Sequence, residues 1–471
     1  MSNGVIMNSE KLSEKAVSLI EALETSRHCD AASVSAIKNI LASEKDFDCY
    51  KINAFRVAFE SGVKNSDMLR AFLYATKLGL FDLNWDIHCP SCHGIPDYHK
   101  HLMGFKKTAH CDLCAINWDL DFEEQVEVTF TVNPDIRKIE YADWSARHDF
   151  ASKMQFLDDI LDRERRDFTI GACVYKNETK TFGADFEQGR YVYYMPSHME
   201  LGGFLEVSAA HSKEEQNFSL AISSAGRFDI QRIKALSGRI NLIVTSDYPE
   251  MNGFLVKPVM PRNNWVSAAY VTSQQEFRDL FSSEFLSPDI SFAIKNITFM
   301  FTDIKGSTEL YEQIGDSAAF AAVKEHFRVM TDIIRKHEGG VVKTIGDAVM
   351  AAFPVNFNAV AAACEIQSLF SSCVFRKGEI KVKIGLHRGG VIAVTSNKSL
   401  DYFGRTVNIA ARVQGKSDAN EVLMTEAVTS DPAVKNYFTA HNVETHERDV
   451  ALKGIDKPIM VFSINFGGAV K

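Results

Sequence analysis

The chain has 471 residues, of which 46% are apolar and 24% charged, and its formal net charge is −9. This composition is typical of a globular protein of about three domains, and it excludes a disordered chain, a collagen-like repeat and a small disulfide scaffold. No stretch approaches ~20 uncharged apolar residues, so no membrane span is expected. The first residues lack the layout of an export signal, and nine cysteines in such a chain indicate reduced thiols and a cytoplasmic location.

Charge is divided unevenly along the chain. Residues 291–471 hold 21 Lys and Arg against 19 Asp and Glu, which leaves 31 against 42 in residues 1–290. A net-acidic first part argues against a broad contact with a phosphate backbone, so no nucleic-acid partner is expected.

Residues 1–84 are predicted to be a helical segment. The apolar positions 12, 16, 19, 20 and 23 follow the spacing of one helical face. The Asn-Ser-Asp sequence at 65–67 offers caps for a further helix, which Gly79 would end.

Residues 85–120 are predicted to form a zinc ribbon. Two Cys-x2-Cys pairs, Cys89 with Cys92 and Cys111 with Cys114, are separated by eighteen residues. This spacing is typical of a four-thiolate zinc site, and four thiolates close the coordination sphere, so the zinc would be structural. The alternatives are four reduced cysteines in loops and a redox pair; the repeated motif disfavours the redox pair.

Residues 121–272 are predicted to form a β-rich domain, and residues 273–293 a connecting helix and linker. Runs typical of strands lie at 126–132, 190–195, 204–208, 218–223, 240–245 and 266–272. We expect a sandwich or a barrel. The sequence Ser-Gln-Gln-Glu at 273–276 is typical of a capping box that opens the connecting helix.

Residues 294–471 are predicted to form the last domain. Apolar strands are expected at 297–302, 341–345, 348–353, 381–386 and 391–395, with helices near 320–334 and 358–371. The first helix is inferred from positions 320, 323, 327, 330 and 334. The order β-α-β-β-α-β is that of a ferredoxin-like fold, so the whole chain is expected to be a multidomain α+β protein.

Two fragments of this last domain combine carboxylates with phosphate-binding backbone. Asp303 ends a strand, and Gly306, Ser307 and Thr308 open a helix whose unpaired N–H groups can bind phosphate oxygens. Asp347 lies at the tip of a Gly-Asp hairpin and can reach Asp303, and two carboxylates at such a corner suit Mg²⁺. Each fragment alone is also compatible with an ordinary turn or helix cap.

Two further fragments carry polar side chains. If residues 406–414 are helical, Asn408 and Arg412 lie one turn apart on one face. An amide beside a guanidinium suits orienting a sugar and neutralising a phosphoryl charge, although two polar residues on a solvated helix face are the commoner arrangement. The Leu-Lys-Gly sequence at 452–454 precedes a last strand at 459–464.

These fragments occur in a family order. The segments FTDIKGST, KTIGDAVMAAF, GLHRGGV, DYFGRTVNIAAR and LKG follow one another within about residues 294–466, and this region resembles the catalytic domain of class III nucleotidyl cyclases. Residues 1–290 resemble, more faintly, an uncharacterised helical, zinc-ribbon and β module found ahead of bacterial soluble cyclases.

The resemblance implies a role for each matching residue. Asp303, Asp347 and the Ile304 carbonyl correspond to ligands of two Mg²⁺ or Mn²⁺ ions. Lys343 and Asp401 correspond to the pair that reads the purine. A lysine can donate to adenine N1 and an aspartate can accept from the 6-amino group, so the expected substrate is ATP. The other matches are the ribose-orienting Asn408, the transition-state Arg412 and Lys453, which meets the terminal phosphates.

The resemblance also implies a reaction and an assembly. The 3′-oxygen of ATP attacks its own α-phosphorus, which releases pyrophosphate and closes 3′,5′-cyclic AMP. In this family the metal aspartates of one subunit work with the base-reading and transition-state residues of the other, so a homodimer is expected. Some relatives have a phosphate-binding arginine where this chain has Gly390, and Arg388 is the candidate substitute.

Residues 1–290 are expected to sense an unknown regulator, with passive stabilisation as the alternative. The alternative functions are a guanylyl or mixed-specificity cyclase and a catalytically silent cyclase-like module for dimerisation or nucleotide binding. A nucleic-acid-binding zinc-ribbon protein is a further reading, which the charge distribution does not support.

Overall fold

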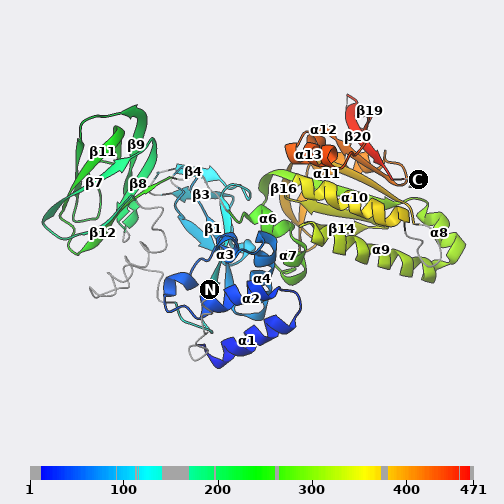
Figure 1. The fold of residues 1–471 in the computed structure, drawn as a ribbon, viewed down its shortest axis with the longest axis horizontal. Coiled ribbons are helices and arrows are strands. Elements are labelled where there is room, and N and C mark those ends of the chain that lie inside the picture. The colour runs from blue at the N-terminus through cyan, green and yellow to red at the C-terminus, as the bar shows by residue number, and fades with distance from the viewer. Residues whose placement is uncertain are drawn as a thin grey trace. The chain divides into compact units, whose positions relative to one another are not determined.

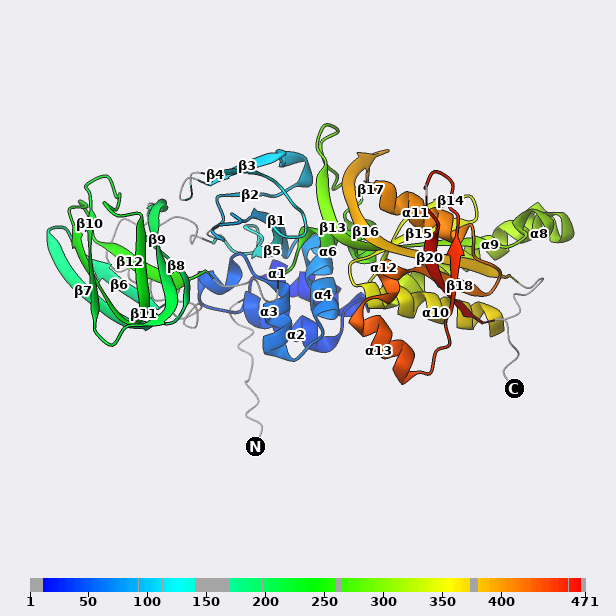
Figure 2. The same cartoon turned by 90° about the horizontal axis from the view of Figure 1, so that it is seen from above.

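The computed structural model describes residues 12–91, 93–111, 114, 116–139, 169–195, 198–259, 265–372, 380–455 and 457–466. The chain divides into two compact units (Figures 1 and 2). The first unit comprises residues 1–98, 108–119 and 129–265, and the second comprises residues 99–107, 120–128 and 266–471. None of the helices in the described ranges is long and apolar enough to cross a lipid bilayer.

The first unit begins with four α-helices, α1 (Glu14–Thr25), α2 (Ala31–Leu41), α3 (Ala54–Ser61) and α4 (Asn65–Leu78), and a 3₁₀ turn, η2 (Asp46–Cys49). The side chains of Ser13, Asp30 and Asn53 cap the first three helices, as expected for short polar residues at this position. Ala16, Ile20 and Leu23 are buried, which confirms the predicted apolar face of α1. Helix α4 ends at Gly79 as predicted.

The next segment contains short strands. They are β1 (Phe81–Ile87), β2 (Asp97–His99), β3 (Thr108–Cys111), β4 (Ile116–Asp119) and β5 (Val126–Val132), with a 3₁₀ turn, η3 (Leu102–Gly104). Strands β2, β1 and β5 pair in that order, and β3 and β4 form a separate hairpin. The strand predicted at 126–132 is confirmed, whereas β1 was not anticipated, since its start lies in the segment predicted to be helical.

The β-rich region is one seven-stranded sheet. Its strands are β6 (Ile170–Val174), β7 (Glu178–Phe186), β8 (Gly189–Met195), β9 (His198–His211), β10 (Gln216–Ile222), β11 (Arg232–Ser246) and β12 (Asn252–Pro258). The order is β10-β11-β9-β8-β12-β6, with β7 also paired to β11. The first half of β11 pairs with β9 and its second half with β7 and β10, so the sheet curls around one core that includes Tyr193, Leu242 and Phe254 (Figure 2).

The second unit starts with two short helices, α6 (Ala268–Ser273) and α7 (Gln275–Leu280). The strand predicted at 266–272 is therefore wrong. Ser267 accepts a hydrogen bond from the Tyr270 N–H and caps α6, and the apolar run is buried in a helix instead of a strand. Helix α7 begins at Gln275, so Ser273 belongs to α6 and does not cap α7.

The rest of the second unit alternates strands and helices. Its elements are β13 (Phe292–Ile304), α8 (Ser307–Ile314), α9 (Asp316–Lys336), β14 (Gly340–Ile345), β15 (Ala348–Phe353), α10 (Asn356–Ser372), β16 (Val382–Ser396), β17 (Ser399–Phe403), α11 (Arg405–Gln414), β18 (Glu421–Thr425), α12 (Glu426–Thr429), α13 (Pro432–Ala440), β19 (His446–Val450) and β20 (Ile459–Asn465).

These strands form an eight-stranded sheet in the order β14-β15-β13-β16-β18-β20-β19, with β17 paired to β16. The first four strands of this sheet have the second-third-first-fourth order of a ferredoxin-like β-α-β-β-α-β unit, which confirms the predicted fold of this domain.

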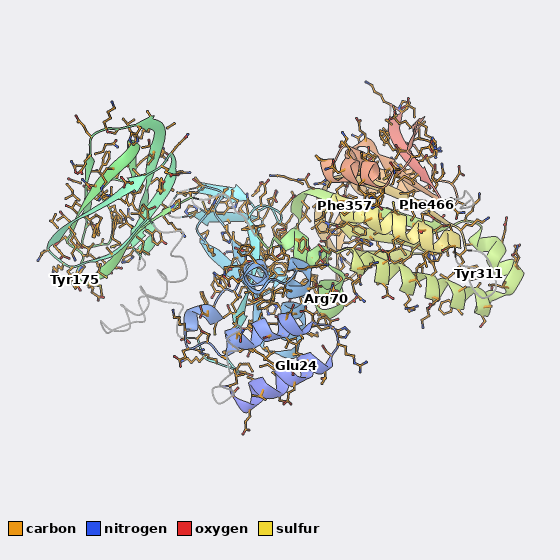
Figure 3. All side chains as sticks on the ribbon, viewed as in Figure 1. Glu24, Arg70, Tyr175, Tyr311, Phe357 and Phe466 are labelled. Atoms are coloured by element: carbon orange, nitrogen blue, oxygen red, sulfur yellow. The ribbon has the colours of Figure 1, made fainter. Side chains whose placement is uncertain are left out.

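The core of this unit lies between the sheet and helices α9 and α10. Met330 and Ile334 of α9 meet Ala363 and Ile366 of α10 over buried strand residues such as Met300, and Figure 1 shows both helices running along the sheet. Tyr311, Phe357 and Phe466 pack against the edge of this core (Figure 3). Burial of such side chains contributes about 1.5–3 kcal/mol each. Phe320 departs from the predicted face of α9, since 65% of it is exposed.

Candidate active site

Two carboxylates meet at one end of the sheet. Asp303 lies one residue before the end of β13, and Asp347 follows Gly346 in the turn between β14 and β15. Strand β15 pairs antiparallel with β13, with Val349 opposite Thr302, so the turn is carried to Asp303. Burial and the neighbouring Asp347 charge raise the pKa of Asp303 above its ordinary value. The structure thus brings the two predicted metal aspartates together.

The donors at this corner fit a divalent cation. Asp347 Oδ2 is buried and has no hydrogen-bond partner within the described ranges. A buried carboxylate oxygen without a donor is costly, and a hard cation satisfies it. Ile304 is the last residue of β13 and its side chain is buried, so its carbonyl is the group it can offer.

Lys383 is a cation at this corner that the sequence reading missed. It lies on β16 directly opposite Asp303, and its Nζ is 3.7 Å from Asp303 Oδ2. The pairing register of β13 with β16 places Lys383 there, and no local sequence pattern marks it. Arg388, the predicted substitute for a phosphate-binding arginine, instead pairs with Asp431 at 3.3 Å.

The predicted phosphate-binding turn has the expected backbone. Gly306 has a left-handed conformation (φ 70°) and stands at the N-cap of α8 without a side-chain cap. Ser307 is the first helical residue, and the side chain of Thr308 lies outside the described ones. The first N–H groups of a helix carry partial positive charge and suit phosphate oxygens.

The predicted base-reading residues form a direct pair, which we call the base clamp. Lys343 of β14 donates to Asp401 Oδ2 of β17 at 2.6 Å, although the two residues are 58 positions apart. Asp401 Oδ1 accepts from the Tyr402 N–H at 2.8 Å, which fixes the carboxylate. The Lys343 side chain is 42% exposed and that of Asp401 is 15% exposed. A donor and an acceptor stand side by side and remain accessible, as reading one edge of a base requires.

Helix α11 and the 452–454 turn form a third group. The buried face of α11 comprises Thr406, Ile409, Ala410 and Val413, so Asn408 and Arg412 lie off that face, as predicted. A Cβ placed on Gly454 would lie 3.6 Å from Arg412 Nη1. Leu452 is buried in a cluster with Ile409 and Val413. The turn that carries Lys453 is thereby held beside Arg412.

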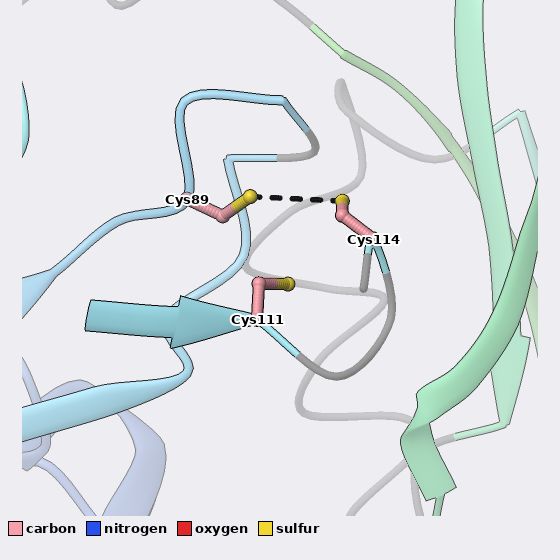
Figure 4. A group of neighbouring side chains, drawn as sticks. All are labelled: Cys89, Cys111 and Cys114. Carbon is pink, nitrogen blue, oxygen red and sulfur yellow. Dashed lines mark hydrogen bonds between the residues drawn. The ribbon is translucent and has the colours of Figure 1, made fainter. Parts of the chain in front are cut away.

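Three of the four predicted zinc ligands converge in the first unit. The Sγ atoms of Cys89, Cys111 and Cys114 all lie within 4.8 Å of one another (Figure 4), and those of Cys89 and Cys114 are 3.6 Å apart. Tetrahedral Zn²⁺ with Zn–S bonds of about 2.3 Å requires S–S separations of about 3.8 Å. The Ser91 N–H points at Cys89 Sγ (3.4 Å). Cys92 lies outside the described residues.

Two family models match separate parts of the chain, one before residue 250 and one after residue 290. Residues 291–465 match the adenylate and guanylate cyclase catalytic domain. Residues 13–249, half of the chain, match a family of unknown function, DUF5939.

Curated relatives match over the catalytic region. An adenylate cyclase of Lachancea kluyveri is 31% identical over 184 residues, which is 34% of this chain and 10% of that protein. The receptor-type adenylate cyclase GRESAG 4.1 of Trypanosoma brucei brucei is 27% identical over 209 residues, covering 36% and 17%. An adenylate cyclase of Anabaena cylindrica is 27% identical over 187 residues, covering 36% and 37%. The chain therefore spans only about a tenth to two fifths of these relatives.

Solved structures match the same share of the chain. A monomeric-state adenylate cyclase from Trypanosoma brucei is 25% identical with a TM-score of 0.32, covering 36% of this chain and 89% of that one. The adenylyl cyclase CyaB from P. aeruginosa is 22% identical with a TM-score of 0.32, covering 37% and 95%.

Proposed function

The chain belongs to the family DUF5939 and carries a class III nucleotidyl cyclase catalytic domain, and from this premise we propose that it converts ATP into 3′,5′-cyclic AMP and pyrophosphate. The observation that carries the proposal is the Lys343–Asp401 pair at 2.6 Å. A lysine donates to adenine N1 and an aspartate accepts from the 6-amino group, whereas guanine presents the opposite pattern. The curated relatives named adenylate cyclases support the same substrate.

The proposed reaction requires no covalent enzyme intermediate. A bond forms between the ribose 3′-oxygen and the α-phosphorus, the bond from that phosphorus to the β-phosphate oxygen breaks, and the 3′-hydroxyl proton passes to solvent. Asn408 orients the ribose, Arg412 stabilises the charge that develops on the α-phosphate, and Lys453 binds the leaving pyrophosphate. Lys383, beside Asp303, adds a cation on the polyphosphate side of the site.

Asp303, Asp347 and the Ile304 carbonyl are the proposed ligands for two Mg²⁺ or Mn²⁺ ions. Ions bound there would acidify the 3′-hydroxyl and neutralise triphosphate charge. Two observations support this assignment: Asp347 Oδ2 has no hydrogen-bond partner among the described residues, and burial and the Asp347 charge raise the pKa of Asp303. A bound cation would stabilise both carboxylates.

A homodimer is the proposed catalytic unit, with the carboxylates of one subunit facing the base clamp and α11 of its partner. Exposed apolar side chains next to the base clamp support this proposed dimer. Ile392 and Phe403 are opposite each other on β16 and β17, and they are 43% and 70% exposed. Together they form a small exposed apolar patch, and larger contiguous patches of this kind mark protein interfaces.

The test of the proposed function is an assay of purified protein with ATP or GTP and with Mg²⁺ or Mn²⁺. We expect cyclic AMP with ATP and at least about tenfold lower kcat/KM with GTP, because the wrong base leaves polar groups of the clamp unpaired. Equal kcat/KM values for ATP and GTP would indicate a mixed-specificity cyclase, and a higher value for GTP would indicate a guanylyl cyclase. The absence of any cyclic product would indicate a catalytically silent module.

A structural zinc ion bound by Cys89, Cys92, Cys111 and Cys114 is proposed for the first unit. Cys111→Ser should lower the zinc content by elemental analysis and lower the melting temperature, because thiolate sites contribute folding free energy. Cys29→Ser is the matched control, since Cys29 lies outside the three-cysteine group. Unchanged zinc content in Cys111→Ser would contradict the site.

The residues ahead of the catalytic domain are proposed to sense a regulator. A role in regulation would appear as a change in cyclase rate on deletion of residues 1–98, which leaves residues 99–107 and 120–128 of the second unit in place. An unchanged rate and unchanged regulation would favour passive stabilisation.

A further inference from the structure

Helix α7 and the residue before it bury three polar side chains at the edge of the catalytic sheet. Gln274, Gln275 and Glu276 are each 5–6% exposed. Burying a polar group costs free energy unless the group is hydrogen-bonded. The partners of these side chains therefore show which parts of the domain the helix contacts. These partners include residues of α6, α7, α9 and β14 and Glu338 between α9 and β14. The nearby Arg278 of α7 contacts β17.

The first contact is with β14, which carries Lys343. Gln275 Oε1 accepts from the Val341 N–H at 2.7 Å, and Gln274 Nε2 donates to the Glu338 carbonyl at 3.1 Å. Strand β14 is the edge of the sheet, so Gln275 pairs a backbone donor that no further strand can pair. A Cβ on Gly340 would lie 2.3 Å from the Ser273 carbonyl oxygen, which shows how closely the strand approaches this segment.

The same contact lies at an irregularity in the strand. The pairing of β14 with β15 shifts by one residue between Val341 and Lys343. A β-bulge of this kind re-aims the side chains that follow it. Gln275 therefore binds Val341, the residue at which the bulge begins, and the bulge determines where the Lys343 side chain points.

The second contact is with β17, which carries Asp401. Arg278 Nη1 donates to the Leu400 carbonyl at 3.1 Å, and its guanidinium lies 5.3 Å from the centre of the Tyr402 ring. Leu400 and Tyr402 are the two neighbours of Asp401 in the chain. The Tyr402 ring is buried and packs edge-on against Phe299 of β13. Arg278 thus contacts the backbone on one side of Asp401 and a buried ring on the other.

We propose that helix α7 positions the base clamp, with Gln275 setting β14 and Arg278 setting β17 so that Lys343 and Asp401 meet the purine at the correct spacing. This inference rests on the proposed function and adds to it the residues on which base selectivity depends. Gln275 and Arg278 are positioning residues, because they act through the strands and do not touch the substrate.

The reason for this dependence is geometric. The two members of the clamp come from strands that are not neighbours in the sheet, since among the described strands β14 lies at one edge and β17 pairs only with β16. Their relative placement is therefore not fixed by a shared ladder of hydrogen bonds. A displacement of about 1 Å is enough to weaken reading of the base, whereas Asp303 on β13 need not move.

The experiment uses the full chain and compares Arg278→Met and Gln275→Leu with the wild type. We expect the ATP-to-GTP ratio of kcat/KM to fall about tenfold in each variant, chiefly through a higher KM for ATP. Arg278→Lys retains a cation near the Leu400 carbonyl and should recover part of the ratio. Competition of ATP and GTP against a fluorescent nucleotide gives the same comparison without turnover.

Arg335→Gln is the matched control. Arg335 on α9 pairs with Asp279 of α7 at 2.7 Å and with Glu276 at 3.7 Å, so its loss removes contacts of the same helix without touching β14 or β17. Its ATP-to-GTP ratio should equal that of the wild type.

Unchanged ratios in Arg278→Met and Gln275→Leu would overturn the inference, and so would an equal fall in Arg335→Gln, because that result would show general docking of the helix. Should one of the two variants not fold, the other and Arg278→Lys decide the question. A wild type that makes no cyclic nucleotide would refute the proposed function instead, and the binding ratios would still test the clamp.

Discussion

At the scale of single residues, the two metal aspartates have different surroundings. Asp303 has Lys383 at 3.7 Å, whereas Asp347 Oδ2 is buried without a partner in the described part of the chain. The sequence identified both aspartates from a strand end and a hairpin. It could not identify Lys383, because a lysine in an alternating strand has no distinguishing local pattern.

Asp303→Asn and Asp347→Asn should each reduce kcat by at least about 100-fold, because each removes an anionic ligand from the proposed metal corner. Neither should lower the melting temperature of metal-free protein, since neutralising one of two neighbouring carboxylates relieves repulsion. Steady-state kinetics and thermal unfolding provide the two readouts. A variant that keeps wild-type kcat would contradict the role of that aspartate.

The buried His387 predicts how the free energy of unfolding changes as the pH falls. Burial lowers its pKa from 6.5 to about 4, so the unfolded chain takes up the proton first and stability is lost as pH falls from about 6.5 toward 4. His387→Asn, which can keep a hydrogen bond to Thr425 Oγ1 (2.8 Å in the wild type), should lose roughly 1–2 kcal/mol less between pH 7 and pH 5. Denaturant unfolding at both pH values measures the difference. Parallel losses in the two proteins would count against a buried neutral imidazole.

At the scale of elements, the periodicity of side chains predicted most of the catalytic domain correctly. The periodicity failed at 266–272, the end of the predicted β-rich domain, where a short buried apolar run is compatible with either strand or helix. The Ser267 side chain caps α6 and thereby favours the helix over a strand. The position of α11 on the sheet could not be predicted from the sequence either, because it depends on a close approach of α11 to β16 at Gly385.

Gly385→Ala should displace α11, which carries Asn408 and Arg412. A Cβ on Gly385 would lie 2.2 Å from the Gln414 N atom, and neither backbone can move freely. We expect a loss of about 1–3 kcal/mol in unfolding free energy and a marked loss of kcat.

Gly346→Ala serves as the comparison for that variant. Nothing lies within 4 Å of a Cβ there, although φ is +64°, so it should lose only about 1 kcal/mol of unfolding free energy through backbone strain. If Gly385→Ala were as stable and active as the wild type, α11 would not be seated as the structure has it.

At the scale of the whole molecule, the proposed shared site gives a complementation test. Asp303→Asn chains and Arg412→Ala chains should each be inactive alone, and mixed chains should regain activity because a heterodimer contains one complete site. At a 1:1 ratio with random exchange, about a quarter of wild-type activity is expected. Sedimentation must show that mixed dimers form. Dimers without recovered activity would refute the shared site.

The sequence by itself determined the identity of the chemical groups: the aspartate pair, the lysine and aspartate of the clamp, the polar residues of α11 and the cysteine pairs. The aspartate pair, the polar residues of α11 and the cysteine pairs depend on residue type and local spacing, which a strand end, a hairpin, a helix turn or a Cys-x2-Cys pair expresses within a few positions. The lysine and aspartate of the clamp came from the family resemblance. The resemblance had paired Lys343 with Asp401, but only the tertiary structure decided that they are in direct hydrogen-bond contact and that Arg278 contacts the strand of Asp401. Those meetings depend on strand order, on a one-residue bulge and on buried side chains from a preceding helix, and long-range packing of this kind leaves no periodic trace in the sequence.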